Sequence, residues 1–181
     1  MWLDDFLRKL RFEKARKFIR EGDVLCDIGC GLEAFLLQSS KGRLTKGIGI
    51  DKKIPAFRSE NLELINSKLE QEIPLSDNSV DCVTMLAVLE HLIYPAAILK
   101  ECFRILKNGG RLIITAPTPR AKFVLELLAY RLKLLDQTEI REHLNYFSLN
   151  QIKDLLAGIG FKIVAARQFE FGFNNFIIAQ K

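Results

Sequence analysis

Val24-Leu25-Cys26-Asp27-Ile28-Gly29-Cys30-Gly31-Leu32-Glu33-Ala34-Phe35 is the stretch that decides the fold. It opens with a short apolar run interrupted by one acid, and two glycines follow before an apolar pattern resumes at Leu32. This order of strand, glycine turn and helix predicts the first half of a βαβ unit. The glycines allow a tight turn and leave room for a ligand, and the helix would aim backbone N–H groups at the same place.

A second acid follows at the spacing of a nucleotide-binding strand pair. The next strand candidate, Gly47-Ile48-Gly49-Ile50-Asp51, ends 22 positions after Gly29 (51 − 29). A carboxylate there can accept hydrogen bonds from both hydroxyls of an adenosine ribose. The loop fits either G-x-G-x-x-A, a dinucleotide fingerprint, or D-x-G-x-G beginning at Asp27. The second pattern resembles the first motif of the class I S-adenosylmethionine-dependent methyltransferases. Asp27 favours this pattern, because it would repel a pyrophosphate but could serve the ammonium of a methionine moiety. A glycine turn that binds nothing is the remaining alternative.

Composition limits the class of protein. The 181 residues are 49% hydrophobic and 27% charged, which fits one globular domain, residues 1–181, with a full core. Neither a membrane span nor a signal peptide is expected, so we expect a cytoplasmic protein. The cysteines show no C-x-x-C pair and no matching histidine spacing, which favours buried thiols and no metal site. They are Cys26, Cys30, Cys82 and Cys102.

Residues 1–20 are expected to form an amphipathic helix. Apolar residues recur at helical spacing from Trp2 to Ile19, and the other face is basic. We expect the apolar stripe to pack on the domain and the basic face to be solvated. The alternative is a helix that contacts a membrane surface or nucleic acid; the net charge of +5 permits either but requires neither, and nucleic acid is not the expected partner. The basic residues are Arg8, Lys9, Arg11, Lys14, Arg16, Lys17 and Arg20.

The rest of the chain alternates strands and helices. This order predicts an α/β fold with a parallel sheet, closed by a terminal hairpin that makes one strand antiparallel. Residues 53–61 are expected to be irregular, and Ser148 is expected to cap a helix. The expected strands are 45–51, 62–65, 79–85, 111–116, 161–167 and 173–179, and the expected later helices begin near Pro95, Ala121 and Ser148.

Five further segments make nearly the whole chain resemble the class I S-adenosylmethionine-dependent methyltransferases, in the small-molecule, type 11/23-like subgroup. They are Asn78-Ser79-Val80-Asp81-Cys82-Val83, Ala87-Val88-Leu89-Glu90-His91-Leu92, Arg104-Ile105-Leu106-Lys107-Asn108-Gly109-Gly110, and Glu142-His143-Leu144-Asn145-Tyr146-Phe147-Ser148 followed by Ala157-Gly158-Ile159-Gly160-Phe161. Asn108 replaces the usual proline of the third segment. The resemblance implies a Rossmann-like, doubly wound, mostly parallel seven-stranded sheet in the order 3-2-1-4-5-7-6. Its last-numbered strand is antiparallel, and helices cover both faces.

The resemblance also implies a cofactor, S-adenosylmethionine, which leaves as S-adenosylhomocysteine. The cofactor would lie across the tips of the first, second and fourth strands, with Asp51 at the ribose and the first glycine loop at the methionine end. Lys68 and Leu69 are the expected adenine contacts, and Glu33 replaces the third glycine of the motif. The residues expected to bind the cofactor are Asp27, Gly29, Cys30, Gly31, Asp51, Lys52, Lys68, Leu69, Leu86 and Ala87.

The implied reaction is an in-line displacement, which depends mostly on positioning and needs a base only if the acceptor must lose a proton. His143, His91 and Tyr146 are the candidate catalytic residues, and Glu90 is a further candidate base. The open alternatives are an NAD-dependent oxidoreductase and a non-catalytic module that only binds S-adenosylmethionine.

Residues 118–147 form the largest segment without another role, and we expect a lid or cap over the acceptor there. An apolar wall with few polar groups favours a small, partly hydrophobic acceptor. The expected apolar face consists of Phe123, Leu127, Tyr130 and Leu134. The sequence does not indicate the oligomeric state.

Overall fold

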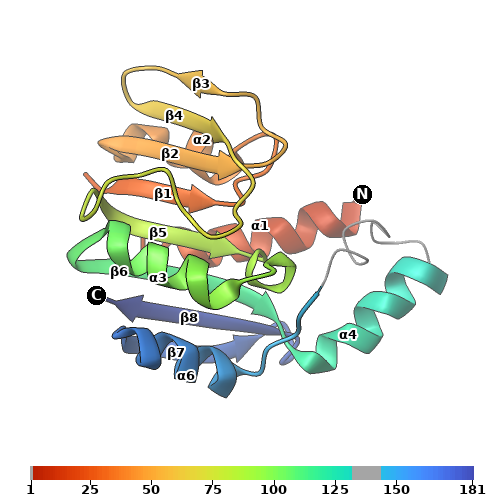
Figure 1. Cartoon of the computed structure of the whole chain (residues 1–181). Helices are drawn as coiled ribbons and strands as arrows, with labels where there is room; N and C mark the ends of the chain where they lie inside the picture. Colours follow the sequence, from red (N-terminus) through yellow and green to blue (C-terminus); the bar gives the residue numbers. More distant parts are fainter. Residues whose placement is uncertain (1, 132–143) are drawn as a thin grey trace.

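A computed structural model, which describes residues 2–131 and 144–181, shows one eight-stranded sheet with helices on both faces (Figure 1). The strand order is β3-β4-β2-β1-β5-β6-β8-β7. The strands are β1 (Val24–Ile28), β2 (Lys46–Asp51), β3 (Phe57–Arg58), β4 (Leu62–Asn66), β5 (Val80–Leu86), β6 (Leu106–Pro117), β7 (Lys162–Phe169) and β8 (Asn174–Gln180).

Seven of these strands have the order expected from the sequence. β4, β2, β1, β5 and β6 run parallel, and β8 pairs antiparallel with both β6 and β7. The expected total of seven was one too few, because β3 adds a two-residue edge strand inside residues 53–61. β3 pairs antiparallel with β4 through Phe57↔Leu64 and Arg58↔Glu63. A strand of two residues is too short to show the alternation of apolar and polar residues by which a strand is recognised in a sequence.

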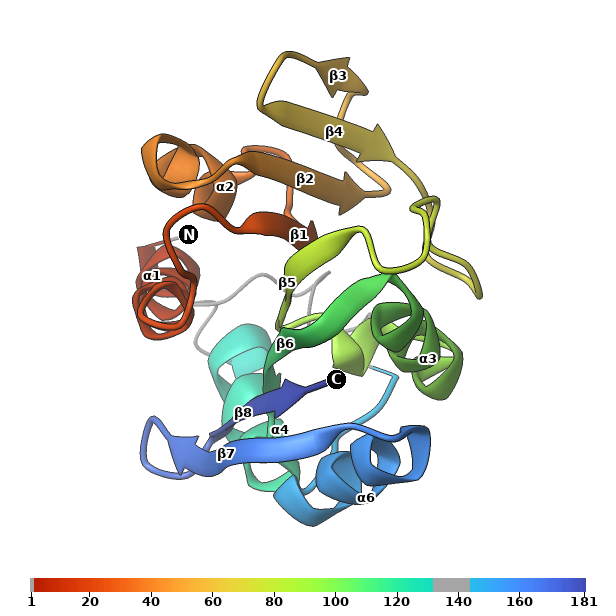
Figure 2. The ribbon, with the colours of Figure 1, turned by 90° about the vertical axis from the view of Figure 1, so that its left-hand side faces the viewer.

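The helices lie in two layers. Figure 2 shows α1 and α2 on one face of the sheet and α3 and α6 on the other. The expected cap at Ser148 is confirmed: its hydroxyl accepts a hydrogen bond from Gln151 N, and the Gln151 side chain accepts one from Ser148 N. The helical elements are α1 (Trp2–Arg16), α2 (Phe35–Ser40), η1 (Lys41–Arg43), η2 (Leu89–His91), α3 (Pro95–Ile105), α4 (Pro119–Glu126), η3 (Leu127–Arg131) and α6 (Leu149–Ile159).

Alternation along the central strands builds two cores. Cys26, Val83 and Ile114 point to the face of α3 and α6, and their neighbours Leu25 and Cys82 point to the face of α1 and α2. Successive side chains of a strand face opposite sides of the sheet, so a strand buried on both faces reads as a continuous apolar run. Within the described ranges, no helix is both long and apolar enough to cross a bilayer.

The glycine loop is longer than the sequence predicts, because α2 begins at Phe35 and not at Leu32. Ala34 has a left-handed backbone with φ 44°, which separates the loop from the helix. The second strand holds the loop, since Gly29 N donates to Ile50 O at 2.8 Å. With six residues, α2 is too short and starts too late to serve as the helix N-terminus that the sequence suggested for ligand binding.

Candidate cofactor and acceptor site

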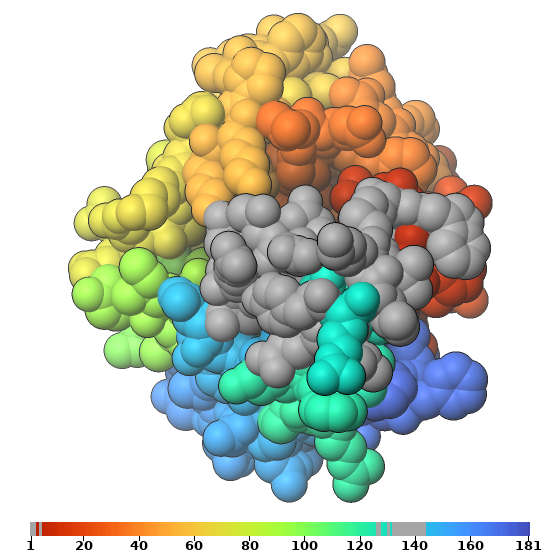
Figure 3. Space-filling view, turned by 90° about the vertical axis from the view of Figure 1, so that its right-hand side faces the viewer, coloured from red at the N-terminus to blue at the C-terminus, as the bar shows by residue number. Residues whose placement is uncertain are grey.

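A large cavity of about 730 Å³ lies at the carboxyl ends of the parallel strands. Ligands of open α/β sheets bind at this edge. Figure 3 looks onto this end of the molecule, where the β1–α2 segment (orange), α4 (blue-green) and the β7–β8 turn (violet) surround the centre of the view. The volume of the cavity falls within the range of small-molecule sites. All ten residues that were expected to bind the cofactor line this cavity.

The two loop glycines have different tasks. Gly29 and Gly31 have φ values of 69° and 70°, which disfavour any residue with a Cβ. A Cβ on Gly31 would meet no atom within 4 Å, whereas one on Gly29 would lie 2.4 Å from Val88 Cγ2. Gly31 therefore borders open space that a ligand can occupy. Position 29 requires a glycine because Val88 packs against the backbone there. This corrects the expectation that both glycines make room for a ligand.

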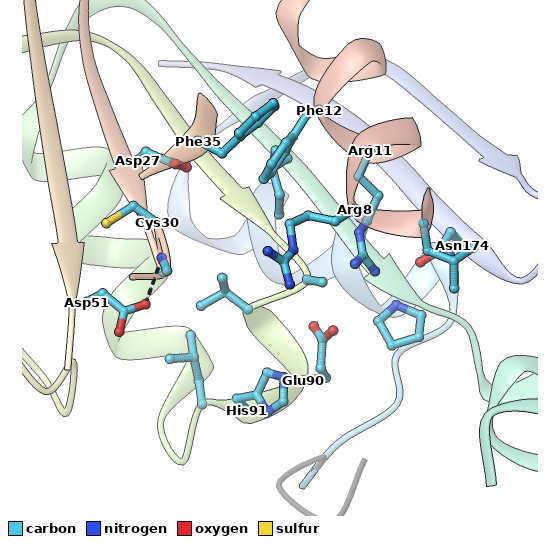
Figure 4. A pocket seen from close by; sticks show the side chains of 18 of the residues that line it. Arg8, Arg11, Phe12, Asp27, Cys30, Phe35, Asp51, Glu90, His91 and Asn174 are labelled. Atoms are coloured by element: carbon cyan, nitrogen blue, oxygen red, sulfur yellow. Dashed lines mark hydrogen bonds between the residues drawn. The ribbon is translucent and has the colours of Figure 1, made fainter. Parts of the chain in front are cut away.

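Asp51 connects the glycine loop to the second strand. Its Oδ2 accepts a hydrogen bond from Gly31 N at 3.0 Å, drawn in Figure 4, and its Oδ1 accepts one from Lys53 N at 2.8 Å. Each carboxylate oxygen can accept a second hydrogen bond. Asp51 is thus held at the cavity wall with capacity left for two hydroxyl donors, which is what a ribose offers.

Asp27 is a buried carboxyl group at the strand tip. Its side chain is 3% exposed, and Oδ1 accepts a hydrogen bond from Thr84 Oγ1 at 2.6 Å. Burial raises the pKa of Asp27 to about 7, the Thr84 hydroxyl opposes this rise, and the charge of Asp51 adds to it. A cationic ligand group would favour the ionised form. An ammonium is therefore better suited to this part of the cavity than a phosphate.

Strained backbone borders the cavity at two places. Ala87 has φ 58°, and its N–H donates to the carbonyl of Thr115 at 2.9 Å and lies 3.2 Å from the hydroxyl of the same residue. Glu170 and Phe171, in the β7–β8 turn, have φ values of 52° and 57°. Left-handed conformations of residues other than glycine cost about 1–3 kcal/mol and cluster at functional sites. Leu86 and Ala87 thus form the edge of the pocket that the sequence predicts.

The wall of the cavity that was expected to contact the adenine is more exposed to solvent than the wall around Asp27. Lys52 and Lys68 are exposed, and the Lys68 ammonium lies 2.7 Å from Glu70 Oε1 at the surface. Leu69 is half-buried and packs against the core, so it offers an apolar surface to the cavity. Cys30 is buried, beside the position where Gly49 leaves room for its sulfur. A specific adenine contact stays a prediction.

The N-terminal helix forms a wall of the cavity, which the sequence did not indicate. Arg8 and Arg11 are half-buried and line the cavity, as Figure 4 shows, so the expectation of a wholly solvated basic face is wrong. The ring of Phe12 stacks on Phe35 with centroids 5.5 Å apart. Contact of this helix with a membrane surface remains an untested alternative. The lining residues of α1 are Leu3, Phe6, Leu7, Arg8, Leu10, Arg11 and Phe12.

The three candidate catalytic residues differ in where they lie relative to the cavity. His91 lines the cavity, and Figure 4 shows its ring beside Glu90. Tyr146 is half-buried but does not line the cavity, and its ring lies 5.9 Å from Lys122 Nζ. Its expected place beside the reacting atoms therefore finds no support. His143 lies outside the described residues. No cluster of metal-ligating side chains occurs in the part of the chain that the structure describes.

Of the expected apolar face, Phe123 is the member whose side chain lies within the described residues, and residues 118–147 contribute to the cavity. Ala121, Val124, Leu125 and Leu128 line it, whereas Phe123 is 74% exposed. The wall of the cavity at the strand tips is polar, with Asp27 and Asp51. The wall formed by Ala121, Val124, Leu125 and Leu128 is apolar. Residues 132–143 are outside the described ranges.

These observations define a class of protein. A doubly wound sheet, a glycine loop with open space at Gly31, and carboxylates on two adjacent strands make a nucleotide-cofactor site with an attached apolar chamber. The chain belongs to the methyltransferase domain family, whose sequence model matches residues 2–166. The cofactor of the class I S-adenosylmethionine-dependent methyltransferases is the one implied above, and its ammonium and ribose hydroxyls suit Asp27 and Asp51.

Individual relatives agree with this family. The chain is 30% identical over 130 residues to the ubiquinone biosynthesis O-methyltransferase of Psychrobacter cryohalolentis, which covers 64% of this chain and 50% of that protein. The chain spans half or less of the length of this and other curated relatives that it matches.

Solved structures match the fold. A chain from the complex of the Haloferax volcanii Trm112 methyltransferase activator with its methyltransferase partner has a TM-score of 0.76 at 16% identity, over 96% of this chain and 88% of that one. A SAM-dependent methyltransferase from Aquifex aeolicus has a TM-score of 0.66 at 22% identity, over 93% and 88%. At these identities the likeness concerns the fold.

Proposed function

We propose that this protein transfers the methyl group of S-adenosylmethionine to a small, partly apolar acceptor. The observation that carries the proposal is the continuity of one cavity between two unlike walls. One wall holds Asp27, Gly31 and Asp51, and the other holds apolar residues of α1 and α4. A cofactor bound at the polar wall leaves the apolar chamber beside it for a second molecule.

The chain's own residues would act mainly by positioning. Asp51 would hold the ribose hydroxyls, and Asp27 would attract the ammonium of the methionine moiety. The apolar side chains of α1 and α4 would exclude water and hold the acceptor in line with the methyl group, which S-adenosylmethionine supplies as a sulfonium methyl when bound. Holding two reactants in line is the main contribution a protein makes to such a displacement.

The name of the ubiquinone biosynthesis relative supports a small-molecule acceptor. The mostly apolar chamber favours the small molecule, because small-molecule sites are concave and lined mainly by apolar side chains. The four described cysteines are buried free thiols, which suits the expected cytoplasmic compartment.

Two measurements test this proposal. S-adenosylhomocysteine should raise the melting temperature by mass action, and NAD should not. Methyl-labelled S-adenosylmethionine should then pass its label to the low-mass fraction of a cell extract rather than to its proteins or nucleic acids. Stabilisation by NAD alone would support the oxidoreductase, label on macromolecules would contradict the small acceptor, and binding without any transfer would identify a non-catalytic module.

A further inference from the structure

The carboxyl group of Glu90 is a buried polar group of the cavity that has no task so far. Its side chain is 1% exposed, yet it lines the cavity, and its Oε2 has no hydrogen-bond partner within the described part of the chain. Figure 4 shows the carboxyl group directed toward the α1 wall. A buried oxygen without a donor is costly, so a ligand that brings a donor to this oxygen would gain affinity.

The position of Glu90 is fixed by the backbone around it. Its carbonyl oxygen accepts hydrogen bonds from Leu144 N at 2.9 Å and Asn145 N at 3.1 Å. The Asn145 side chain donates to Leu92 O at 3.0 Å, which ties the same segment to the other end of the η2 turn. The turn therefore holds the carboxyl group in place.

The cavity around Glu90 also holds two guanidinium groups and the carboxyl group of Glu170. Figure 4 shows Arg8 and Arg11 of α1 on one side of Glu90, His91 beside it, and Asn174 of β8 farther along the cavity. Burial raises the pKa of Glu90 to about 7, and the charge of Arg11 opposes this rise. A base that titrates near neutral pH is well matched to taking a proton from a substrate.

These surroundings discriminate among acceptors. A protonated amine would lie beside two guanidinium groups, whose repulsion offsets its attraction to the single carboxylate of Glu90. An aliphatic hydroxyl is too weak an acid to lose its proton to a carboxylate of this kind. A phenolic hydroxyl, with a pKa of about 10, is within reach, and its ring suits the apolar wall.

We propose that Glu90 binds the hydroxyl of an aromatic acceptor and takes its proton during methyl transfer. The proposal rests on the proposed function. The acceptor oxygen forms the bond to the methyl carbon as its proton passes to Glu90, and the electron pair of the carbon–sulfur bond goes to sulfur. The products are a methyl ether, neutral S-adenosylhomocysteine and protonated Glu90, which returns its proton to water.

The test compares two probes of the same shape, 4-fluorophenol and 4-fluorotoluene, by fluorine NMR on protein saturated with S-adenosylhomocysteine. The wild type should prefer the phenol by about tenfold or more, the scale of a hydrogen bond to a charged group. The preference should weaken as the pH falls through about 7. Glu90→Gln should lose most of the preference and its pH dependence. The matched control is Glu33→Gln, an exposed carboxylate that lines the same cavity and whose loss should leave the preference unchanged.

The outcomes separate this inference from the proposed function. Equal preference in the wild type and Glu90→Gln would overturn the inference, and so would a wild type that binds both probes alike or neither. The wild-type measurement decides even if the variant does not fold. A wild type that fails to bind S-adenosylhomocysteine would instead refute the proposed function.

Discussion

The proposed cofactor wall, which holds Asp27, Gly31 and Asp51, and the proposed acceptor wall, formed by apolar residues of α1 and α4, are built in different ways. The cofactor wall comes from loops that directly follow neighbouring strands, and its two carboxylates belong to β1 and β2, which pair in register through Asp27↔Gly49. The proposed acceptor wall combines elements from distant parts of the chain, such as Leu7 of α1 and Leu125 of α4. Backbone hydrogen bonds fix the first wall, whereas the packing of helices fixes the second. Substitutions in the first wall should therefore have sharper effects.

The largest effect is expected from Gly31→Val. Valine at φ 70° is strained, and its side chain would enter the open space beside the loop. We expect at least a hundredfold loss of affinity for S-adenosylhomocysteine, measured by calorimetry. Gly22→Val is the control, because Gly22 has φ 80° and equally open surroundings but does not line the cavity. If both variants bind normally, the backbone of Gly31 does not approach the ligand.

Asp27→Asn should increase stability and reduce binding. The folded-state pKa of Asp27 is raised to about 7, above the unfolded value of about 4, so its ionised form destabilises the fold. This cost grows as pH rises from about 4 to about 7, and removing it should gain up to about 4 kcal/mol. The gain should be full at pH 8 and absent at pH 4, as followed by urea unfolding. An equal gain at both pH values would show that ionisation is not the cause.

Asp51→Ala should weaken binding of S-adenosylhomocysteine by about 1.5–3 kcal/mol, because it removes hydrogen bonds to a charged group. Calorimetry would measure the change. Asp77→Ala is the control: this carboxylate pairs with Arg104 at the surface, far from the cavity lining. Unchanged affinity in Asp51→Ala would remove Asp51 from the site.

The smallest effect is expected at the junction of the two walls. Phe12→Ala removes the stack on Phe35, and we expect a loss of about 0.5–1.5 kcal/mol in unfolding free energy beyond the loss of buried area. Phe171→Ala, which removes a fully exposed ring, should change stability by less than about 0.5 kcal/mol. Similar losses in both variants would show that the stack does not hold α1 against the cofactor loop.

The sequence predicted the cofactor wall because its determinants are local. A carboxylate and two glycines after one strand, and a carboxylate at the end of the next, are read directly from the order of residues. The apolar runs of the buried strands and the Ser148 cap are equally local, and the strand order followed from the resemblance to a known family. The structure brings Asp27, Gly31 and Asp51 to one cavity because strand ends meet at one edge of a parallel sheet.

Only the tertiary structure decided the acceptor wall. The periodicity of residues 2–16 shows a helix but not what each face meets, so Arg8 and Arg11 could be placed at the cavity only after α1 was packed. The same holds for α4, where Phe123 faces outward although its spacing suited an inward face. Glu90 shows the reason most clearly, because burial, an unpartnered oxygen and a raised pKa come from neighbours distant in sequence. Charge and burial at such a site are sums over the whole fold, and no local pattern encodes them.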